Sequence, residues 1–342
     1  MKSAAPASGR NAHRLFVSTK DYEMKWFLAI VITLAGVSIG QSQDYPNKAI
    51  RLIHGYAPGG ATDNVARILS EGLRKELGQP IVVESRPGAS GTLAATAVAR
   101  SEPDGYTLIL GTVGSQTINV QLISPPPYDP VRDFSAIGLV VINDGVVVVN
   151  NSFPAKSLKE FVEELKKNPD KYFFGSSGTG GPTHLGGELL KSTLGVQMTH
   201  VPYRGDGPAL TDVFGGTLPI HVTVMASAAP FIQSGSVRAI AALGEQRFPE
   251  FPDLPTIAES GYPGFSAGAW IALFAPGGTP APIVKTLSDA TRKVLADPEV
   301  VKRLAALGSR VQASTPEGLT DLVKADYKKW GDVIRENKIN VQ

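Results

Sequence analysis

The sequence contains no cysteine among its 342 residues. Disulfides, thiolate metal sites and cysteine nucleophiles are therefore excluded together. Strong net charge is also absent, because the formal value is only +2 and no basic block or acidic tail occurs. The chain thus offers no electrostatic track for nucleic acid. None of its five histidines has the helical spacing of a metal site, so we expect no metal ligand set.

One apolar run near the N-terminus indicates where the protein is located. Met24-Lys25 is followed by Trp26–Ile39, a run of 14 uncharged and mostly apolar residues, and small residues come next. This order predicts a signal peptide over residues 24–43 that is cleaved on export. The run is shorter than the roughly 20 residues of a membrane span, which makes a permanent anchor the less favoured alternative. Residues 1–23 are polar and patternless, and we interpret them as a start-site extension.

The small positive charge belongs to this leader. Residues 1–40 hold five basic and two acidic residues, so the remaining chain has 28 basic and 29 acidic residues and a net charge of −1. A surface with this balance does not steer toward polyanions. We expect an exported protein that is free in the periplasm.

A repeating order of strand, glycine-rich loop and helix begins near residue 48. Ile50–Tyr56, Ile81–Glu84 and Tyr106–Leu110 are predicted strands, and apolar stripes after the first two predict helices. Strands that alternate with helices indicate an α/β fold with a parallel sheet covered on both faces. A second unit of the same kind begins after Val146–Asn150, where Ser157 to Glu160 forms a capping box.

The C-terminal segment contains too little sheet for a third domain. Phe265–Phe274 is its one predicted strand, and three predicted helices follow it. We therefore expect the chain to return to the first domain, crossing near residues 141–149 and 265–272, and two crossings make a hinge. The predicted domains are residues 44–143 with 270–342, and residues 144–269.

The ligand of a parallel sheet binds at the carboxyl ends of the strands, where the strand order reverses. With the first-domain order second–first–third, this rule selects Tyr56–Asp63 and Gly111–Ser115. In the second domain it selects Ser176–Thr183, Tyr203–Gly207 and Met225–Ala228. These loops are rich in glycine and hydroxyl groups, and several open helices, whose N-termini attract anions. No phosphate-loop or dinucleotide fingerprint occurs, so carboxylate is favoured over phosphate and no cofactor is expected.

An enzyme is the competing class of protein. Gly264–Gly268 fits the nucleophile-elbow pattern of hydrolases, but a strand-like run follows Ser266 and the last histidine, His221, precedes it. We interpret this match as chance. His54, His200 and His221 lie in apolar strands and are predicted to be interior histidines.

Three residues near the favoured loops keep two interpretations each. His184 either lines the cleft or packs its own helix. Asp63 is either an early-helix residue stabilised by the dipole or, as we favour, the residue that holds the Pro-Gly-Gly loop in shape. Arg204 either clamps a carboxylate through two hydrogen bonds or, as we favour, is a solvated loop charge.

Seven stretches together point to one family. They are Tyr45–Arg51, Ala57–Asp63, Val82–Gly88, Pro103–Leu108, Tyr128–Phe134, Val201–Gly205 and Leu254–Glu259, and they span nearly all of the chain from residue 45 onward. In these stretches the sequence resembles the tripartite tricarboxylate transporter substrate-binding proteins, also called the Bug family. The resemblance implies a type II periplasmic-binding-protein clamshell of two α/β domains. It also implies that the ligand carboxylate meets backbone groups of the Pro-Gly-Gly loop.

The expected function follows from the loops and the resemblance together. The chain is expected to be a monomeric receptor that binds a small carboxylate and delivers it to the permease subunits of a tripartite tricarboxylate transporter. The predicted ligand-binding residues are Tyr56, Pro58, Gly59, Gly60, Thr62, Asp63, Thr112, Gly114, Ser115, Ser176, Ser177, Gly178, Thr179, His184, Arg204 and Ser227. Relatives often carry an aspartate in the loop that here reads Met225–Ala228, so the resemblance implies an acid without an amino group. An exported enzyme acting on small organic acids and a ligand sensor for a membrane kinase remain the alternatives.

Overall fold

A computed structural model describes residues 45–339, and those from Pro46 onward form a single compact unit. The predicted extension and signal peptide, residues 1–23 and 24–43, lie outside the described residues. Within residues 45–339 no helix combines the length and the apolar character that crossing a membrane requires.

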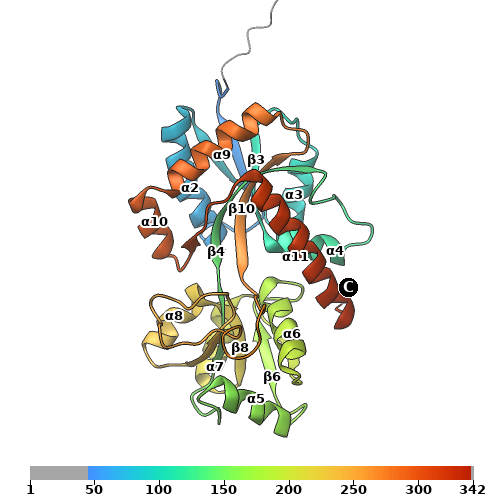
Figure 1. Ribbon diagram of the computed structural model, residues 1–342, viewed down its shortest axis with the longest axis vertical. Coiled ribbons are helices and arrows are strands. Elements are labelled where there is room, and N and C mark those ends of the chain that lie inside the picture. Colours follow the sequence, from blue (N-terminus) through green and yellow to red (C-terminus); the bar gives the residue numbers. More distant parts are fainter. Residues whose placement is uncertain (1–44, 340–342) are drawn as a thin grey trace, which may run out of the picture. The chain divides into compact units, whose positions relative to one another are not determined.

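Two mixed β-sheets organise the described chain (Figure 1). The first sheet has the spatial order β11-β4-β10-β3-β1-β2, and the second has the order β7-β6-β8-β5-β9. The strands are β1 (Ile50–His54), β2 (Ile81–Ser85), β3 (Thr107–Thr112), β4 (Phe134–Asn143), β5 (Gly145–Val149), β6 (Phe173–Ser176), β7 (Thr199–Pro202), β8 (Ile220–Val224), β9 (Arg238–Ala242), β10 (Ala269–Pro276) and β11 (Arg310–Val311). We call the first sheet with its helices lobe 1 and the second sheet with its helices lobe 2.

Helices cover both sheets (Figure 1). Lobe 1 carries α2 (Ala61–Leu77), α3 (Thr92–Ala99), α4 (Asn119–Leu122), α9 (Ala281–Leu295), α10 (Pro298–Ala305) and α11 (Pro316–Glu336). Lobe 2 carries α5 (Leu158–Lys167), α6 (Pro182–Leu194), α7 (Asp206–Gly215) and α8 (Met225–Gln233). The local signals act as expected: α2 ends at Gly78 in the left-handed conformation, and the Ser157 side chain caps α5 by accepting from the N–H of Glu160.

Strand directions agree with the predicted order and add antiparallel pairs. Strand β1 lies between β2 and β3 and is parallel to both, which is the order second–first–third. Strand β10 is antiparallel to β3 and β4, and β5 is antiparallel to β8 and β9. The sheets are therefore mixed rather than parallel throughout. The antiparallel strands are those that bring the chain from one lobe to the other and back.

Three local predictions need correction. Phe134–Asn143 was not predicted as a strand, yet it forms β4, which lies between β11 and β10 in the sheet of lobe 1. The Met225–Ala228 segment is not a loop but the first turn of α8, which contains Pro230. The Gly111–Ser115 segment is also not a loop: Gly111 and Thr112 belong to β3, and a π-helical turn begins at Gly114. The two helical turns are hidden by short polar and small residues, which fit a turn as well as a helix start, whereas β4 has the apolar sequence of a strand.

The chain passes between the lobes at Asp144, which separates β4 from β5, and returns through the segment that follows β9. Asp144 is buried, and one of its carboxylate oxygens lies 3.2 Å from Arg310 Nη2. A Cβ atom at Gly244 or Gly268, both on the return segment, would lie 2.4 Å or 2.7 Å from this carboxyl group. Burial raises the pKa of Asp144. The two connections are therefore packed against each other around one buried acid.

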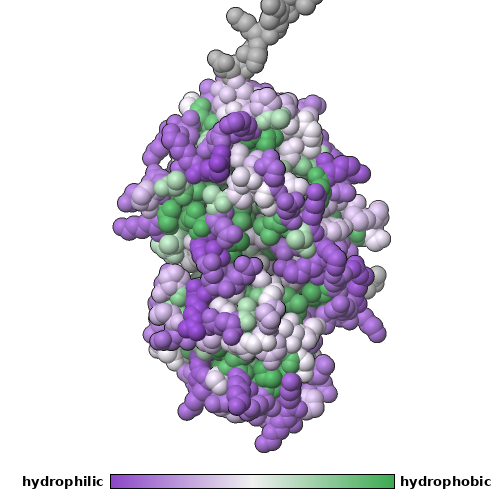
Figure 2. All heavy atoms as spheres, in the orientation of Figure 1, coloured by the Kyte–Doolittle hydropathy of each residue, from purple (hydrophilic) through white to green (hydrophobic). Residues whose placement is uncertain are grey.

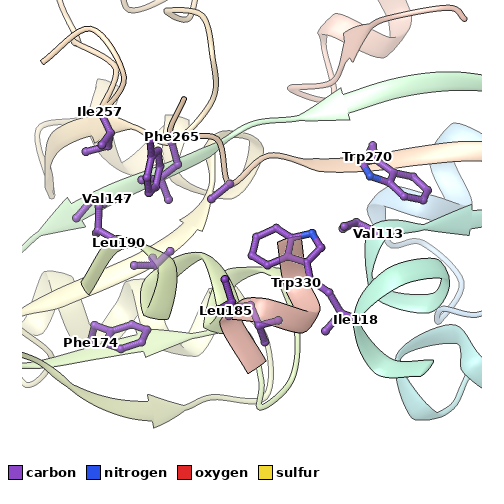
Figure 3. Close-up of a cluster of buried hydrophobic side chains, with 14 of the residues drawn as sticks. Val113, Ile118, Val147, Phe174, Leu185, Leu190, Ile257, Phe265, Trp270 and Trp330 are labelled. Atoms are coloured by element: carbon purple, nitrogen blue, oxygen red, sulfur yellow. The ribbon is translucent and has the colours of Figure 1, made fainter. Parts of the chain in front are cut away.

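A hydrophobic cluster extends through both lobes (Figure 3). Trp330 on α11 is fully buried and lies between Leu185 on α6 and Ile118 near the end of β3 (Figure 3). Trp270 on β10 belongs to the same cluster and donates its indole N–H to Asp326 at 2.7 Å. The C-terminal helix thus packs on the sheet of lobe 1 and also touches lobe 2.

Candidate functional site

The Pro-Gly-Gly loop of lobe 1 is held by Asp63. This carboxylate is 2% exposed and accepts from the N–H of Gly59 at 2.9 Å and from Arg67 Nε at 2.9 Å. Its other oxygen lies 3.1 Å from His54 Nε2. Pro58, Gly59 and Gly60 themselves are exposed. Asp63 is therefore a support beneath the loop, and Pro58, Gly59 and Gly60 form the exposed part of the loop.

Electrostatics keep this support charged. The hydrogen bond from Arg67 lowers the pKa of Asp63 to about 2, and the bonds from Gly59 and His54 act in the same direction. Burial lowers the pKa of His54, against the raising effect of Asp63. Asp63 therefore stays ionised beneath the loop at any physiological pH, and its charge is matched by Arg67.

The segments that follow β1 and β3 contact each other through the side chains of Tyr56, Thr112 and Ser115. The Tyr56 hydroxyl lies 2.7 Å from Thr112 Oγ1 and donates to the carbonyl of Ser90 at 3.1 Å. A Cβ atom on Gly114 would lie 3.3 Å from the same hydroxyl. Thr112 and Ser115 bond to each other's backbone and are almost completely buried. These predicted residues therefore lie together, with Tyr56 the more accessible of them.

The glycine-rich loop of lobe 2 is shaped by hydroxyl groups. Thr183 Oγ1 accepts from the N–H of Ser177 at 3.0 Å and lies 2.8 Å from its hydroxyl. Ser176 is fully buried, and its Oγ accepts from the N–H of Gly178 at 3.2 Å. Thr179 is exposed at the tip. Ser177, Gly178 and Thr179 are therefore the part of this loop that faces outward.

Two histidines form the base of the lobe-2 loop. His184 is 6% exposed, accepts from the N–H of Gly180 at 3.1 Å, and stacks on His200 with ring centroids 3.7 Å apart. His200 Nε2 lies 2.7 Å from Ser176 Oγ. Burial lowers the pKa of His184 to about 4 and that of His200 to about 3. Both rings are therefore neutral supports, and His184 packs below the loop rather than lining its surface.

The remaining lobe-2 residues lie at the starts of α7 and α8. Ser227, in the first turn of α8, donates to Asp206 in the first turn of α7 at 3.1 Å. Arg204 is exposed. Asp206 was not among the predicted residues, because an acid at a helix start needs no further role than its favourable interaction with the dipole. Its contact with Ser227 depends on strand order β7-β6-β8, which no local signal reveals.

The helices that open from these loops share one feature. In the described chain α2, α6 and α7 begin at Gly60, Gly181 and Gly205, and none of these starts has a side-chain cap. Helix α8 begins after Val224, again without such a cap. The first N–H groups of a helix have no partner within it and carry partial positive charge. These helix starts therefore leave N–H donors at the strand ends of the two lobes. The exceptions are the N–H of Met225, which donates to the carbonyl of Asp144 at 3.0 Å, and Pro182 and Pro208, which have no N–H.

The described residues give little support for a metal site or for a hydrolase active site. Within residues 45–339 no group of three or more histidine, cysteine, aspartate or glutamate side chains is placed to hold a metal ion. Ser266 of the elbow-like Gly264–Gly268 lies in a loop ahead of strand β10, so the helix that a nucleophile elbow requires does not follow it.

A separate hollow of about 650 Å³ lies between α8 and the α10–β11 segment. Met225, Phe248 and Leu307 contribute apolar walls, and Asp144 and Arg310 also line it. Figure 2 shows hydrophobic surface beside α10 on this face. This hollow does not contain the glycine loops, but Met225 and Ala226 at the start of α8 line it.

Comparison with known proteins identifies the family. Residues 65–339 match the family model described as the tripartite tricarboxylate transporter family receptor. Protein BugT of Bordetella pertussis is 34% identical over 311 residues, which cover 90% of this chain and 95% of BugT. A UPF0065 protein of Agrobacterium vitis is 37% identical over 315 residues, which cover 91% of each chain.

Solved structures agree on the fold. The periplasmic binding protein BugD is 38% identical, with a TM-score of 0.72 over 87% of this chain and 100% of BugD. MatC of Rhodopseudomonas palustris, solved with bound malate, is 37% identical, with a TM-score of 0.72 over 85% of this chain and 100% of MatC. Another R. palustris protein, solved with adipate, is 31% identical, with a TM-score of 0.75 over 87% of this chain and 99% of its own. The predicted two-domain fold is thus confirmed, and these neighbours are solute-binding receptors rather than enzymes. The chain belongs to the tripartite tricarboxylate transporter receptor family.

Proposed function

We propose that the chain is an extracytoplasmic receptor that binds a small carboxylate between its lobes and delivers it to a tripartite tricarboxylate-type membrane transporter. The observation that carries this proposal is the set of four uncapped helix starts, at α2, α6, α7 and α8. A hydrogen bond to a charged group contributes roughly 1.5–3 kcal/mol, so several can hold one carboxylate without a cation. The malate and adipate in two related structures support an acid as the ligand class.

In this proposal twelve of the sixteen predicted residues divide by role. The exposed backbone of Pro58, Gly59 and Gly60, together with the outward part of the lobe-2 loop, meets the ligand. Asp63, Thr112, Ser115, Ser176 and His184 are almost completely buried and hold those backbones in place. Arg204 is exposed and is not required as an anchor. A loop fixed from below can bind different acids when only the side chains around it change.

The proposed domains are residues 44–143 with 270–342, and residues 144–269. They rotate about the two connections packed at Asp144, and the ligand closes them. Asp144 and the glycines beside it leave little room for side chains at this point, so the connections bend as one element. Small-angle scattering with saturating ligand should then give a smaller radius of gyration than the empty protein gives, and an unchanged radius would contradict closure.

Export and delivery complete the proposal. A signal peptide at residues 24–43 sends the chain to the periplasm, where it acts as a monomer and docks on permease subunits. Mass spectrometry of periplasmic protein should find residues 24–40 removed.

The first test is binding by the protein purified from the periplasm. Calorimetry against mono-, di- and tricarboxylates should find at least one acid that binds, and the amide of that acid should bind far more weakly. A ligand at 100 times its dissociation constant should also add about 2.7 kcal/mol to the free energy of unfolding. Loss of the receptor should abolish cellular uptake of the same acid. Equal binding of acid and amide would contradict a carboxylate site, and unchanged uptake would contradict the delivery role.

A further inference from the structure

Asp206 brings a carboxylate to the ligand-facing edge of lobe 2. It is the first residue of α7, and its side chain is 17% exposed. One oxygen lies 3.2 Å from Nε2 of His221 on β8. The other accepts from the hydroxyl of Ser227, in the first turn of α8, at 3.1 Å. The starts of α7 and α8 therefore meet at this carboxylate.

No lysine or arginine of the described residues forms an ion pair with Asp206, so its charge is offset by the partial positive charge at the starts of α7 and α8. Ser227 is a neutral donor. His221 is fully buried, and its Nδ1 has no hydrogen-bond partner within the described chain. A buried N–H group without an acceptor is costly, so we place the ring proton on Nε2, which donates to Asp206. Arg204 is exposed, and no ion pair joins it to Asp206 in the described residues.

The other acid near the cleft is in a different state. Asp63 in lobe 1 is 2% exposed and is paired with Arg67, so neither its charge nor its oxygens are offered to a ligand. Asp206 keeps exposed oxygen surface, and an ionised carboxylate has about four acceptor positions, of which two are used here. Lobe 2 therefore has acceptor capacity and negative charge that lobe 1 lacks.

Asp206 also lies beside the glycine loop of lobe 2. The N–H of Tyr203, three residues before it, donates to the carbonyl of Ser176 at 3.0 Å. A Cβ atom on Gly178 would lie 3.8 Å from the Tyr203 carbonyl oxygen. The segment that leads into α7 and the Ser177–Gly181 loop are therefore adjacent, and both end at the same edge of the sheet.

We propose that Asp206 sets the ligand class: an acid whose end toward lobe 2 carries a hydrogen-bond donor, a hydroxyl or an ammonium group, in preference to a second carboxylate. This proposal rests on the proposed function, with the first carboxylate of the ligand assigned to the uncapped starts of α2 and α6, away from Asp206. A donor at the far end satisfies the free positions on Asp206. A second carboxylate there faces a like charge, and no lysine or arginine of the described residues forms an ion pair with Asp206. The expectation of an acid without an amino group considered only residues 225–228, and Asp206 supplies a carboxylate to that place from the neighbouring helix.

The wild-type protein provides the first test, with ligands of matched length. Calorimetry compares succinate, 4-hydroxybutyrate and 4-aminobutyrate, and then adipate, 6-hydroxyhexanoate and 6-aminohexanoate. We expect the donor-bearing acids of the better-fitting length to bind about tenfold to a hundredfold more tightly than the dicarboxylate, the range of one hydrogen bond to a charged group. The hydroxy and amino arms distinguish the two donors. Tighter binding of the dicarboxylate in both series would overturn the proposal.

Asp206→Asn is the second test, because it removes the charge and keeps an oxygen for Ser227. It should reduce or invert the preference for donor-bearing acids by tenfold or more. Asp170→Asn is the matched control: Asp170 is exposed, lies ahead of β6 at the other end of the sheet, and has a φ of 63°, which asparagine tolerates. An unchanged preference in a folded Asp206→Asn protein would refute the role of Asp206. If no acid binds the wild-type protein at all, the proposed function fails instead.

Discussion

The helices of this protein begin in two different ways. Helices α5, α10 and α11 begin at Ser157, Asp297 and Thr315, and each of these side chains accepts a hydrogen bond from the first turn. Helices α2, α3, α6, α7 and α8 follow strands of the parallel parts of the sheets, and within the described chain none of them has a side-chain cap. Four of these five begin at a glycine.

In the proposed function, the capped helix starts contribute to stability and the uncapped ones to ligand binding. A serine, threonine or aspartate cap contributes about 1 kcal/mol relative to alanine. Where the cap is absent at a strand end, that contribution is forgone and the N–H donors stay available. Helix α9 begins at Pro280, also without a cap, but it follows the antiparallel β10 and so starts at the opposite end of its sheet. An uncapped start is therefore informative only together with its position.

The largest effect is expected when a cap is added to α2, one of the helices that lack a side-chain cap. Gly60 has an extended conformation, and a Cβ there would meet only the Ala57 carbonyl at 3.4 Å, so Gly60→Asp should fold. Its carboxylate would occupy the first-turn N–H groups of α2 and repel the ligand. We expect affinity for the bound acid to fall more than about a hundredfold, equivalent to two hydrogen bonds to a charged group.

Gly60→Asn separates the two causes, because asparagine caps a helix without adding charge. It should weaken binding less than Gly60→Asp does, while thermal unfolding shows both proteins folded. Calorimetry that finds both variants within about threefold of wild type would show that the start of α2 is not the anchor.

A smaller effect should follow from removing a single donor. Proline suits the first position of a helix and lacks an N–H group, and Gly60 already has the extended conformation that a following proline requires. Ala61→Pro should therefore keep α2 intact and lower affinity about tenfold to a hundredfold. Ala281→Pro makes the same change at the start of α9, away from the cleft, and should leave affinity unchanged. Equal effects of the two substitutions in calorimetry would remove the distinction between the two ends of the sheet.

Low pH provides a further test, because it acts on the buried histidines that support the loop before the uncapped helix α6. Histidine in an unfolded chain titrates near pH 6.5, whereas the folded protein lowers the pKa of His184 to about 4 and of His200 to about 3. Between these values the unfolded chain binds protons that the folded chain does not. The free energy of unfolding should therefore fall as pH falls through this window, by roughly 2–4 kcal/mol between pH 7 and 5.

Burial lowers the pKa of His54 as well, so it adds to the same slope. His200→Gln keeps a partner for Ser176 and removes one titrating group, which should make the slope shallower. Denaturant unfolding at a series of pH values measures it, and identical slopes for wild type and variant would argue against a neutral His200 in the fold.

Much of the fold could be predicted from local signals. Gly78 ends α2 and Ser157 begins α5 because each acts through its own backbone neighbourhood. Strand β4 was missed although its sequence, FSAIGLVVIN, has the apolar and β-branched residues of a strand, and its place in the sheet comes from pairing with β10 far along the chain. Helix α8 was not predicted either: it begins at Met225, where the sequence was interpreted as a loop, and its nine residues include Pro230.

The candidate site was predicted less completely, for a related reason. Glycine loops and hydroxyl side chains are visible in sequence, and they indicate which segments present a backbone. Whether a residue supports a loop or faces the ligand depends on burial: His184 and Ser176 lie beneath their loop, and Asp206 lies beside it. Those positions depend on contacts between β6, β7 and β8, which tertiary structure alone determines.

The position of Trp330 has a practical consequence for spectroscopy. Two of the three tryptophans lie in the described residues, and Trp270 is hydrogen-bonded within lobe 1, whereas Trp330 touches both lobes. Within the described chain the indole nitrogen of Trp330 has no partner, and the ring packs among apolar side chains with Lys329 Nζ 4.6 Å from its centroid. Any separation of α6 from α11 would bring water to this ring and shift its emission to longer wavelength. The protein therefore carries its own optical reporter of lobe movement, and ligand screening requires no added dye.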